Sequence, residues 1–368
     1  MIQIGDSLHW HAGTGRLAVM IRRGDMAIGQ IGLGLDFSLG MSFEDQQTLA
    51  REAADLGYQS LWTPEGAGLD SFHLCAMRNQ ASGLATGIGV CPIAYRSPVA
   101  FAMSAGTVSA MSGGKFSLGI GSGGIYRADA RQQLGLPRRS TLGVMREYTA
   151  AVKGLLAGKS VTIQGESVQY DGVQLGFRPP PTPVLVGALG PQMIQLGAEV
   201  GDGAVLNWCD PERVQWSRDQ LNEGAAKAGK RPEDVQLVEY IRICVDEDVE
   251  TARMSYAKSM LGYALGQSVP TERLRKFAYR AHFERMGFTD ELASLDDMRS
   301  RGATADEVAA AASEELLTKV GYYGNASGAK AAFEALADGL DTAIVRVVAA
   351  KPGLESVRAV MRACAPSR

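Results

Sequence analysis

The sequence has few of the residues on which metal sites and disulfide frameworks depend. Its 368 residues include five cysteines and four histidines, and no two cysteines form a C-x-x-C pair. Neither H-E-x-x-H nor G-x-S-x-G occurs, so the motifs of zinc peptidases and of serine hydrolases are absent. Scattered cysteines in an odd number are typical of small buried hydrophobic residues in a reducing compartment. We therefore predict a cytoplasmic protein without a metal site.

Strong charge and long apolar runs are missing as well. The formal net charge is −3, which favours neither nucleic acid nor an anionic membrane surface as a partner. No apolar run approaches the roughly 18 residues that cross a bilayer. With 46% hydrophobic and 21% charged residues, the composition is that of a globular protein with a large core. We expect no nucleic-acid partner and no membrane partner.

The first residues differ in composition from those that follow. Residues 1–27 mix histidine, glycine and arginine without periodicity, and Arg22 and Arg23 come after the short apolar run at 17–21. A secretory signal would place positive charge before a longer apolar run. We predict that residues 1–27 form a disordered arm and that residues 28–368 form one domain, since no linker rich in proline, serine or charge divides them.

Strand-like and helix-like segments alternate from about residue 30 onward. The predicted strands are 31–37, 60–63, 86–92, 115–120, 184–186, 203–207, 235–245 and 342–348. Most are followed by a segment with helical spacing or a helix cap. Eight such units in one chain predict an α/β fold, a closed (β/α)8 TIM barrel, with an open doubly wound sheet as the alternative.

Two segments depart from this alternation. Residues 160–177 alternate apolar and polar side chains around Asp171-Gly172, as a β-hairpin does. Residues 266–316 are polar and helix-prone and lack strand character, which predicts a helical insertion in the barrel.

The segment at 183–198 has the pattern of a buried strand, a glycine turn and a helix. Residues 184–186 are apolar, Gly187 and Gly190 bracket the turn, and Pro191 suits the first helical position. The unpaired N–H groups and partial positive charge at such a helix start favour a phosphate. The segment is a candidate phosphate cradle, with an ordinary tight loop as the alternative.

A second glycine-rich stretch, at 119–124, formally matches G-x-G-x-x-G. A dinucleotide-binding fingerprint needs a helix directly after it, whereas residues 127–137 are predicted to form an irregular loop. We therefore reject a dinucleotide-binding fold.

The active site of such a barrel lies at the C-terminal ends of its strands. The residues at the predicted strand ends are Asp36, Glu65, Val90, Cys91, Gly121, Ser122, Gly123, Gly187, Ala188, Leu189, Gly190, Asn207 and 240–244. Three of these ends are rich in glycine, which leaves bare backbone for a flat ring system to approach. The Glu65 carboxylate is a candidate proton relay, and a solvated loop acid is the alternative.

The order of these motifs resembles the bacterial luciferase-like flavin and deazaflavin oxidoreductases, in particular the F420-dependent branch similar to methylenetetrahydromethanopterin reductase. Four pieces in family order carry the resemblance, which spans roughly residues 28–365. They are 57–62 with Glu65, 86–93 with 96–98, 112–115 with 118–123, and 186–191 with 201–203.

The resemblance implies a place for each matching residue around a cofactor. The Gly89–Val90 bond would be a cis peptide behind the central ring, and the backbone of Gly187, Ala188, Leu189 and Gly190 would hold the phosphate. Gly121, Ser122 and Gly123 would lie along the ring and its side chain, with Asp36 assigned to the same site. Glu65 would face the reactive edge as the catalytic group.

The implied function is that of a homodimeric oxidoreductase that transfers a hydride between coenzyme F420 and a small organic substrate. An FMN-dependent luciferase-like monooxygenase is the alternative, and a barrel that binds the cofactor without turnover is a third hypothesis. The acidic tail of F420 favours a basic surface near it. Arginines that could meet this tail, or could be solvated surface residues, are Arg127, Arg131, Arg138 and Arg139.

Aromatic residues of the insertion are expected either to shape the substrate pocket or to belong to the core. They are Phe277, Tyr279 and Phe283, with Tyr263 just before the insertion.

Overall fold

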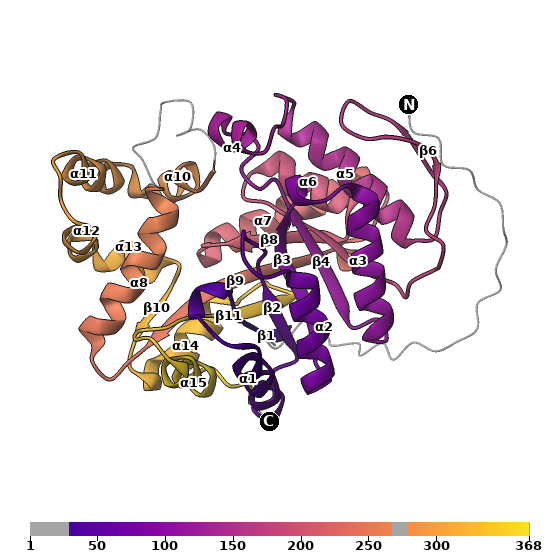
Figure 1. The fold of residues 1–368 in the computed structure, drawn as a ribbon. Coiled ribbons are helices and arrows are strands. Elements are labelled where there is room, and N and C mark those ends of the chain that lie inside the picture. The colour runs from indigo at the N-terminus through magenta and orange to yellow at the C-terminus, as the bar shows by residue number, and fades with distance from the viewer. Residues whose placement is uncertain (1–28, 267–277, 368) are drawn as a thin grey trace.

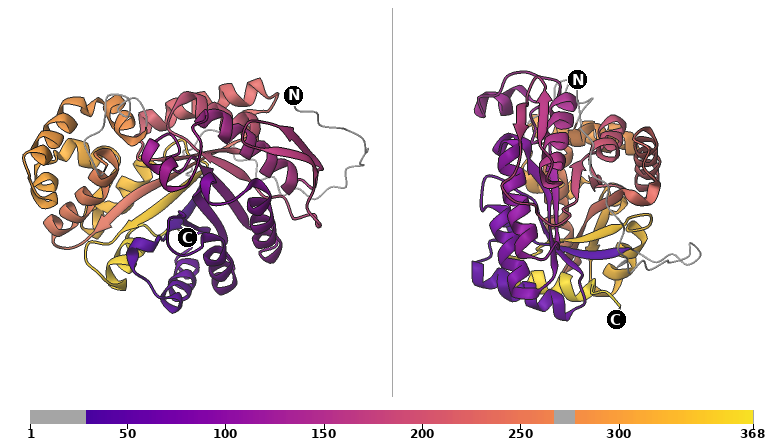
Figure 2. Two further views of the ribbon diagram at one scale, coloured as in Figure 1. Left: turned by 45° about the horizontal axis from the view of Figure 1, so that its top comes forward. Right: turned by 90° about the vertical axis from the view of Figure 1, so that its right-hand side faces the viewer.

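The computed structural model describes residues 29–266 and 278–367. Eight parallel strands close into a barrel that helices surround (Figures 1 and 2). The barrel strands are β1 (Gln30–Gly34), β2 (Ser60–Thr63), β3 (Ala85–Pro92), β4 (Phe116–Gly121), β7 (Val184–Gly187), β8 (Gly203–Asn207), β9 (Gln236–Val245) and β11 (Thr342–Val348). The ring closes because β8 pairs with β9 and β11 pairs with β1. The predicted barrel is confirmed, and the open sheet is wrong.

The helices of the outer layer begin at caps that the sequence provides. The Asp45 N–H donates to the Ser42 hydroxyl at 3.1 Å, and the Ser42 N–H donates back to the Asp45 carboxylate at 2.9 Å. Pro98 and Pro191 occupy first helical positions. These helices are α1 (Phe43–Asp55), α2 (Ser71–Ser82), α3 (Pro98–Met111), α5 (Thr141–Leu156), α6 (Pro191–Val200), α7 (Pro211–Lys227), α8 (Val249–Ala264), α14 (Ala326–Leu336) and α15 (Leu354–Ala363). Every helix within 29–266 and 278–367 is too short or too polar to cross a membrane.

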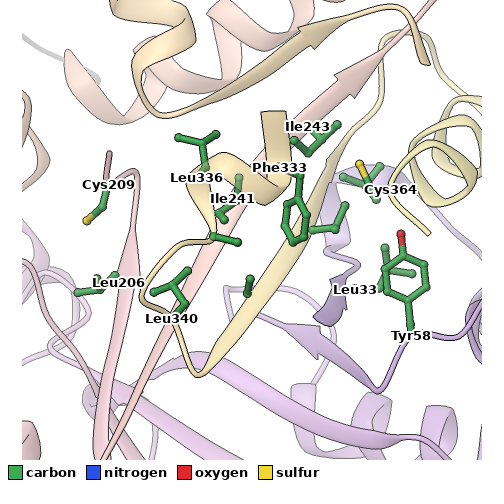
Figure 3. Packing of buried hydrophobic residues seen from close by; sticks show 14 of the residues in the cluster. Leu33, Tyr58, Leu206, Cys209, Ile241, Ile243, Phe333, Leu336, Leu340 and Cys364 are labelled. Carbon is green, nitrogen blue, oxygen red and sulfur yellow. The ribbon is translucent and has the colours of Figure 1, made fainter. Parts of the chain in front are cut away.

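Side chains on the barrel strands alternate between two buried faces. On β9, Ile241 and Ile243 face the helices and pack in one cluster with Phe333 (Figure 3). Val238 and Tyr240 of the same strand point into the barrel. The interior cluster consists of Trp62, Leu185, Val205, Val238, Tyr240 and Ile344. Burial on both faces explains why these strands read as continuous apolar runs in the sequence.

The predicted hairpin is present as β5 (Val161–Gln164) and β6 (Gln169–Val173), but its turn is not at Asp171-Gly172. Those two residues lie within β6. The turn is at 165–168, where the Glu147 carboxylate accepts the N–H groups of Glu166, Ser167 and Val168 at 3.1, 2.7 and 2.9 Å. A contact from α5 therefore determines the turn, and the local Asp-Gly signal does not.

The predicted insertion is helical, and its elements are α10 (Ala278–Phe283), η4 (Glu284–Phe288), α11 (Thr289–Ser300), α12 (Ala305–Ala311) and α13 (Glu314–Lys319). Its apolar side chains pack with α8 in a cluster around Trp208 and Tyr256. The helices of the insertion lie beside the barrel (Figure 2). Residues 267–277, with Phe277, and the predicted arm at 1–27 lie outside the described residues.

Several short elements were not predicted. Strand β10 (Gly321–Gly324) pairs with β9 outside the ring. The expected irregular loop at 127–137 contains α4 (Ala128–Gln133), so this part of the prediction is wrong. Helix α4 does not begin directly after Gly124, and the closed ring excludes a dinucleotide-binding fold. The single-turn helices are η1 (Phe37–Leu39), η2 (Ile93–Tyr95) and η3 (Pro232–Asp234).

Candidate active site

A cavity of about 1220 Å³ opens at the C-terminal ends of the barrel strands. Of the residues predicted to bind the cofactor or to act in catalysis, all except Asp36 line it, namely Glu65, Gly89, Val90, Gly121, Ser122, Gly123, Gly187, Ala188, Leu189 and Gly190. Of the other predicted strand-end residues, Asn207 and Tyr240 line it, whereas Cys91 and 241–244 do not. Asp36 is buried and forms an ion pair with Arg346, which does line the cavity. Asp36 is therefore not part of the cavity wall, but it holds the Arg346 side chain, which is.

Val90 forms a surface of the cavity between three glycine-rich strand ends. The Gly89–Val90 peptide bond is cis, as the family resemblance implies. A Cβ on Gly121 would lie 2.4 Å from Cγ2 of Val90, and a Cβ on Gly187 would lie 3.1 Å from both Val90 methyls. The sequence predicts bare backbone here for a flat ring, whereas these two glycines make room for the Val90 side chain. The residues are those expected, but the physical reason is different.

The start of α6 presents free backbone donors to the cavity. Gly190 precedes Pro191, and no side chain caps this helix. The N–H groups of Gln192 and Met193 in the first turn therefore have no intrahelical acceptor. A Cβ on Gly190 would have no atom within 4 Å, so the space beside it is open. This end of the cavity has the room, the donors and the helix polarity that a phosphate needs.

Arginines surround the outer part of the cavity. Arg131, Arg138 and Arg139 line it, whether or not they meet a cofactor tail, and Arg139 lies 3.5 Å from the Glu166 carboxylate. Arg127 is paired with Asp129 and is not in the wall. Arg285 also lines the cavity, and sequence reasoning missed it because its position depends on how the insertion folds back.

Glu65 lines the cavity, but both of its carboxylate oxygens are engaged. Arg96 donates to Oε1 at 2.7 Å, and the Cys91 thiol donates to Oε2 at 2.9 Å. Burial, together with the Glu65 charge, raises the pKa of Cys91, so the thiol keeps its proton. The Glu65 N–H donates to the Val90 carbonyl at 3.2 Å. These contacts give Glu65 a part in holding Val90, and its catalytic role stays a prediction.

The opposite wall carries polar and aromatic side chains from β8, β9, β11 and the insertion. Asn207, Tyr240, Tyr263, Tyr279 and Arg346 line this side. Asn207 Nδ2 donates to the Tyr279 hydroxyl at 2.7 Å. Sequence reasoning missed Arg346, and the signal that could have found it is the inward face of β11, on which it follows Ile344 at the strand period of two.

Tyr279 confirms the expectation that the insertion helps to shape the pocket, and Tyr263 lines the pocket from α8, just before the insertion. Phe283 instead belongs to the core, which was the alternative, because it is fully buried and does not line the cavity.

A closed barrel with a cavity at the C-terminal ends of its strands has the architecture of a TIM-barrel enzyme. The model of the luciferase-like monooxygenase family matches residues 15–343, so the chain belongs to this family and is an enzyme. A 5,10-methylenetetrahydromethanopterin reductase from Archaeoglobus fulgidus is 30% identical over 240 residues, which cover 65% of this chain and 71% of the relative.

Two further proteins show the breadth of the similarity. An F420-dependent glucose-6-phosphate dehydrogenase from Beutenbergia cavernae is 29% identical over 157 residues, covering 41% of this chain and 46% of the relative. The solved structure of a coenzyme F420 dependent tetrahydromethanopterin reductase from Methanopyrus kandleri matches with a TM-score of 0.72 at 18% identity, covering 92% of this chain and 97% of that one. At this identity, the structural likeness shows the fold alone.

Proposed function

We propose that this enzyme uses coenzyme F420 to transfer a hydride to or from a small organic substrate. The supporting observation is that Arg131, Arg138 and Arg139 line the same cavity as the start of α6, the phosphate-type end. Arg138 and Arg139 precede α5, which packs beside α6. FMN ends at its phosphate, whereas F420 continues into an acidic tail, so arginines beyond the phosphate have a natural partner only in F420. The glucose-6-phosphate dehydrogenase relative is F420-dependent by name, which favours this cofactor while leaving the substrate open.

The residues present fit such a cofactor. The start of α6 offers N–H groups beside the open space at Gly190, and Val90 offers an apolar surface for a ring. When bound, the deazaflavin supplies two-electron hydride chemistry, and the chain supplies position and charge. The homodimer, the cytoplasmic location and the absence of a nucleic-acid partner stay predictions, and light scattering of the purified protein measures the first.

The phosphate end is tested by Gly190→Leu. The leucine fills open space above the helix start, so we expect the fold to persist and the affinity for both F420 and FMN to fall at least about tenfold, roughly 1.4 kcal/mol. Gly176→Leu is the matched control, since a Cβ on Gly176 would also have no atom within 4 Å and this residue does not line the cavity. Fluorescence titration measures each dissociation constant, and an unchanged affinity in Gly190→Leu contradicts the phosphate site.

The choice of cofactor is tested by removing the tail contacts. In Arg138→Ala/Arg139→Ala we expect about tenfold weaker binding of F420, and less than about twofold weaker binding of its tail-less fragment, because charge-assisted contacts to the tail are lost. Arg127→Ala is the control, as Arg127 is paired with Asp129 outside the cavity. Equal losses for both ligands contradict a tail contact. Tighter binding of FMN than of F420 by the unaltered protein supports the monooxygenase alternative.

A further inference from the structure

Tyr263 is held in a defined orientation at the cavity wall. Its ring packs edge-on against Tyr279, with ring centroids 4.8 Å apart, and against Trp208 at 5.6 Å. The guanidinium of Arg242 lies 4.8 Å from the centroid of the same ring. The phenol therefore sits between two aromatic rings and a cation, with its residue in contact with the cavity.

The Arg242 cation is itself fixed from several sides. It is only 2% exposed, it stacks on Trp208 at 3.8 Å, and its Nη1 donates to Oδ1 of Asn207. Its Nη2 is buried and has no hydrogen-bond partner among the described residues. A buried guanidinium with an unused donor stabilises negative charge that develops beside it.

The charged groups around Tyr263 act in opposite directions. Burial alone would raise the pKa of Tyr263, but Arg242 on β9 and Arg346 on β11 outweigh it, so the pKa is lowered. Asp36, at the end of β1, opposes them in part. Burial and the neighbouring Tyr263 raise the pKa of Tyr279 to about 12. Of this pair, Tyr263 is the phenol that its surroundings make more acidic.

The other proton carriers of the described wall are less suited to proton transfer. Burial raises the pKa of Tyr126 and of Tyr240. Both oxygens of Glu65 are engaged by Arg96 and Cys91. Glu166 lies at the outer rim with Arg139, and its side chain is 75% exposed.

We propose that Tyr263 is the catalytic acid of this enzyme and that its substrate is a carbonyl compound, reduced to an alcohol with the oxygen against Tyr263 and facing Arg346. This inference rests on the proposed hydride transfer. An oxygen that becomes negative as it is reduced is what the two guanidinium groups stabilise. A substrate reduced at a carbon–nitrogen bond would begin as a cation or a weak base and would gain nothing from them.

The step balances with the reduced deazaflavin as the two-electron donor. The carbonyl carbon accepts a hydride and forms a C–H bond while the C=O π bond breaks and its electron pair moves to oxygen. That oxygen takes the proton from the Tyr263 hydroxyl, which leaves a phenolate beside Arg242. Water returns the proton to Tyr263, and alcohol oxidation is the same sequence in reverse, with the phenolate as the base.

The first test uses the protein without cofactor. Ultraviolet difference titration follows tyrosine ionisation in the unaltered chain, in Tyr263→Phe and in Tyr279→Phe. We expect one tyrosine to ionise at lower pH than the others, and we expect this step to be absent in Tyr263→Phe and retained in Tyr279→Phe. A titration without an early step, or an early step that survives in Tyr263→Phe, overturns the proposal.

The second test uses reduced F420 with a panel of aldehydes and ketones and a matched panel of imines, following the deazaflavin absorbance. We expect turnover of carbonyl compounds, a fall in kcat of about 100-fold in Tyr263→Phe, and an F420 dissociation constant within about twofold of the unaltered one. Carbonyl reduction needs the protonated phenol, so kcat/KM falls as the pH rises through the pKa of Tyr263, and this limb disappears in Tyr263→Phe.

The outcomes separate the two proposals. If F420 does not bind, the proposed function is wrong, whatever the tyrosine titration shows. If F420 binds and only imines are reduced, or if Tyr263→Phe keeps its kcat and pH profile, the cofactor proposal stands and the assignment of Tyr263 and of a carbonyl substrate is wrong.

Discussion

The two halves of the barrel mouth differ in the residues at their strand ends, which are glycines in one half and polar or charged residues in the other. On β3, β4 and β7 the strand ends carry glycines around Val90, which leave much of the backbone bare. On β8, β9 and β11 the strand ends carry Asn207, Arg242 and Arg346, whose side chains are charged or polar and largely buried. A wall of glycine backbone leaves room for a large rigid ligand. A wall with buried guanidinium groups can stabilise charge on one small group. Under the proposed function, the glycine half would bind the cofactor and the charged half would act on the substrate.

The comparison predicts that the charged half depends most on intact pairs. In Asp36→Asn the buried Arg346 loses its partner, and we expect the free energy of unfolding to fall by about 3 kcal/mol. The affinity for F420 should stay within about twofold, because Asp36 is not in the cavity wall. Denaturant unfolding and fluorescence titration measure the two quantities, and a large loss of affinity at unchanged stability would return Asp36 to the cofactor site.

The glycine half should instead be sensitive to added volume. In Gly121→Ala the new methyl would meet Cγ2 of Val90 at 2.4 Å, and we expect a loss of about 1–3 kcal/mol of unfolding free energy. Removing the opposing methyls in Gly121→Ala/Val90→Ala should restore part of that loss. A double-mutant cycle by denaturant unfolding measures the coupling, and strict additivity of the two single changes would show that Val90 is not the reason for the glycine.

A smaller effect concerns the outer face of β9 in the charged half. Burial raises the pKa of Glu239 to about 8 from an ordinary value of 4.5, although the Cys209 N–H and Arg242 oppose this. Between these two values the folded protein holds a proton that the unfolded chain releases, so the free energy of unfolding falls as the pH rises. In Glu239→Gln we expect this decline to disappear, with a gain of about 1 kcal/mol or more at pH 8. Unfolding curves at pH 5 and pH 8 measure it, and parallel declines in both proteins contradict the assignment.

The sequence analysis found the residues of the glycine half more completely than those of the charged half. Glycine, proline and short apolar runs are local signals, so Gly187–Gly190 and the start of α6 could be placed at a strand end without any tertiary information. Arg346 and Tyr263 carry no such signal, because an arginine in a strand or a tyrosine in a helix is common in any α/β protein. Even where the residues were right, as at Gly121, the reason was misjudged, since the contact with Val90 comes from another strand.

Local chemistry alone determined that this chain alternates strands and helices and ends several strands in glycine, because periodicity and turn residues act between near neighbours. Only the tertiary structure decided which buried charged side chains lie next to one another. Asp36 and Arg346 are joined across the closure of the barrel, and Arg242 reaches Tyr263 because α8 packs against β9. Electrostatic pairing in a buried site depends on distances between segments that are remote in sequence, and only the packed chain sets those distances.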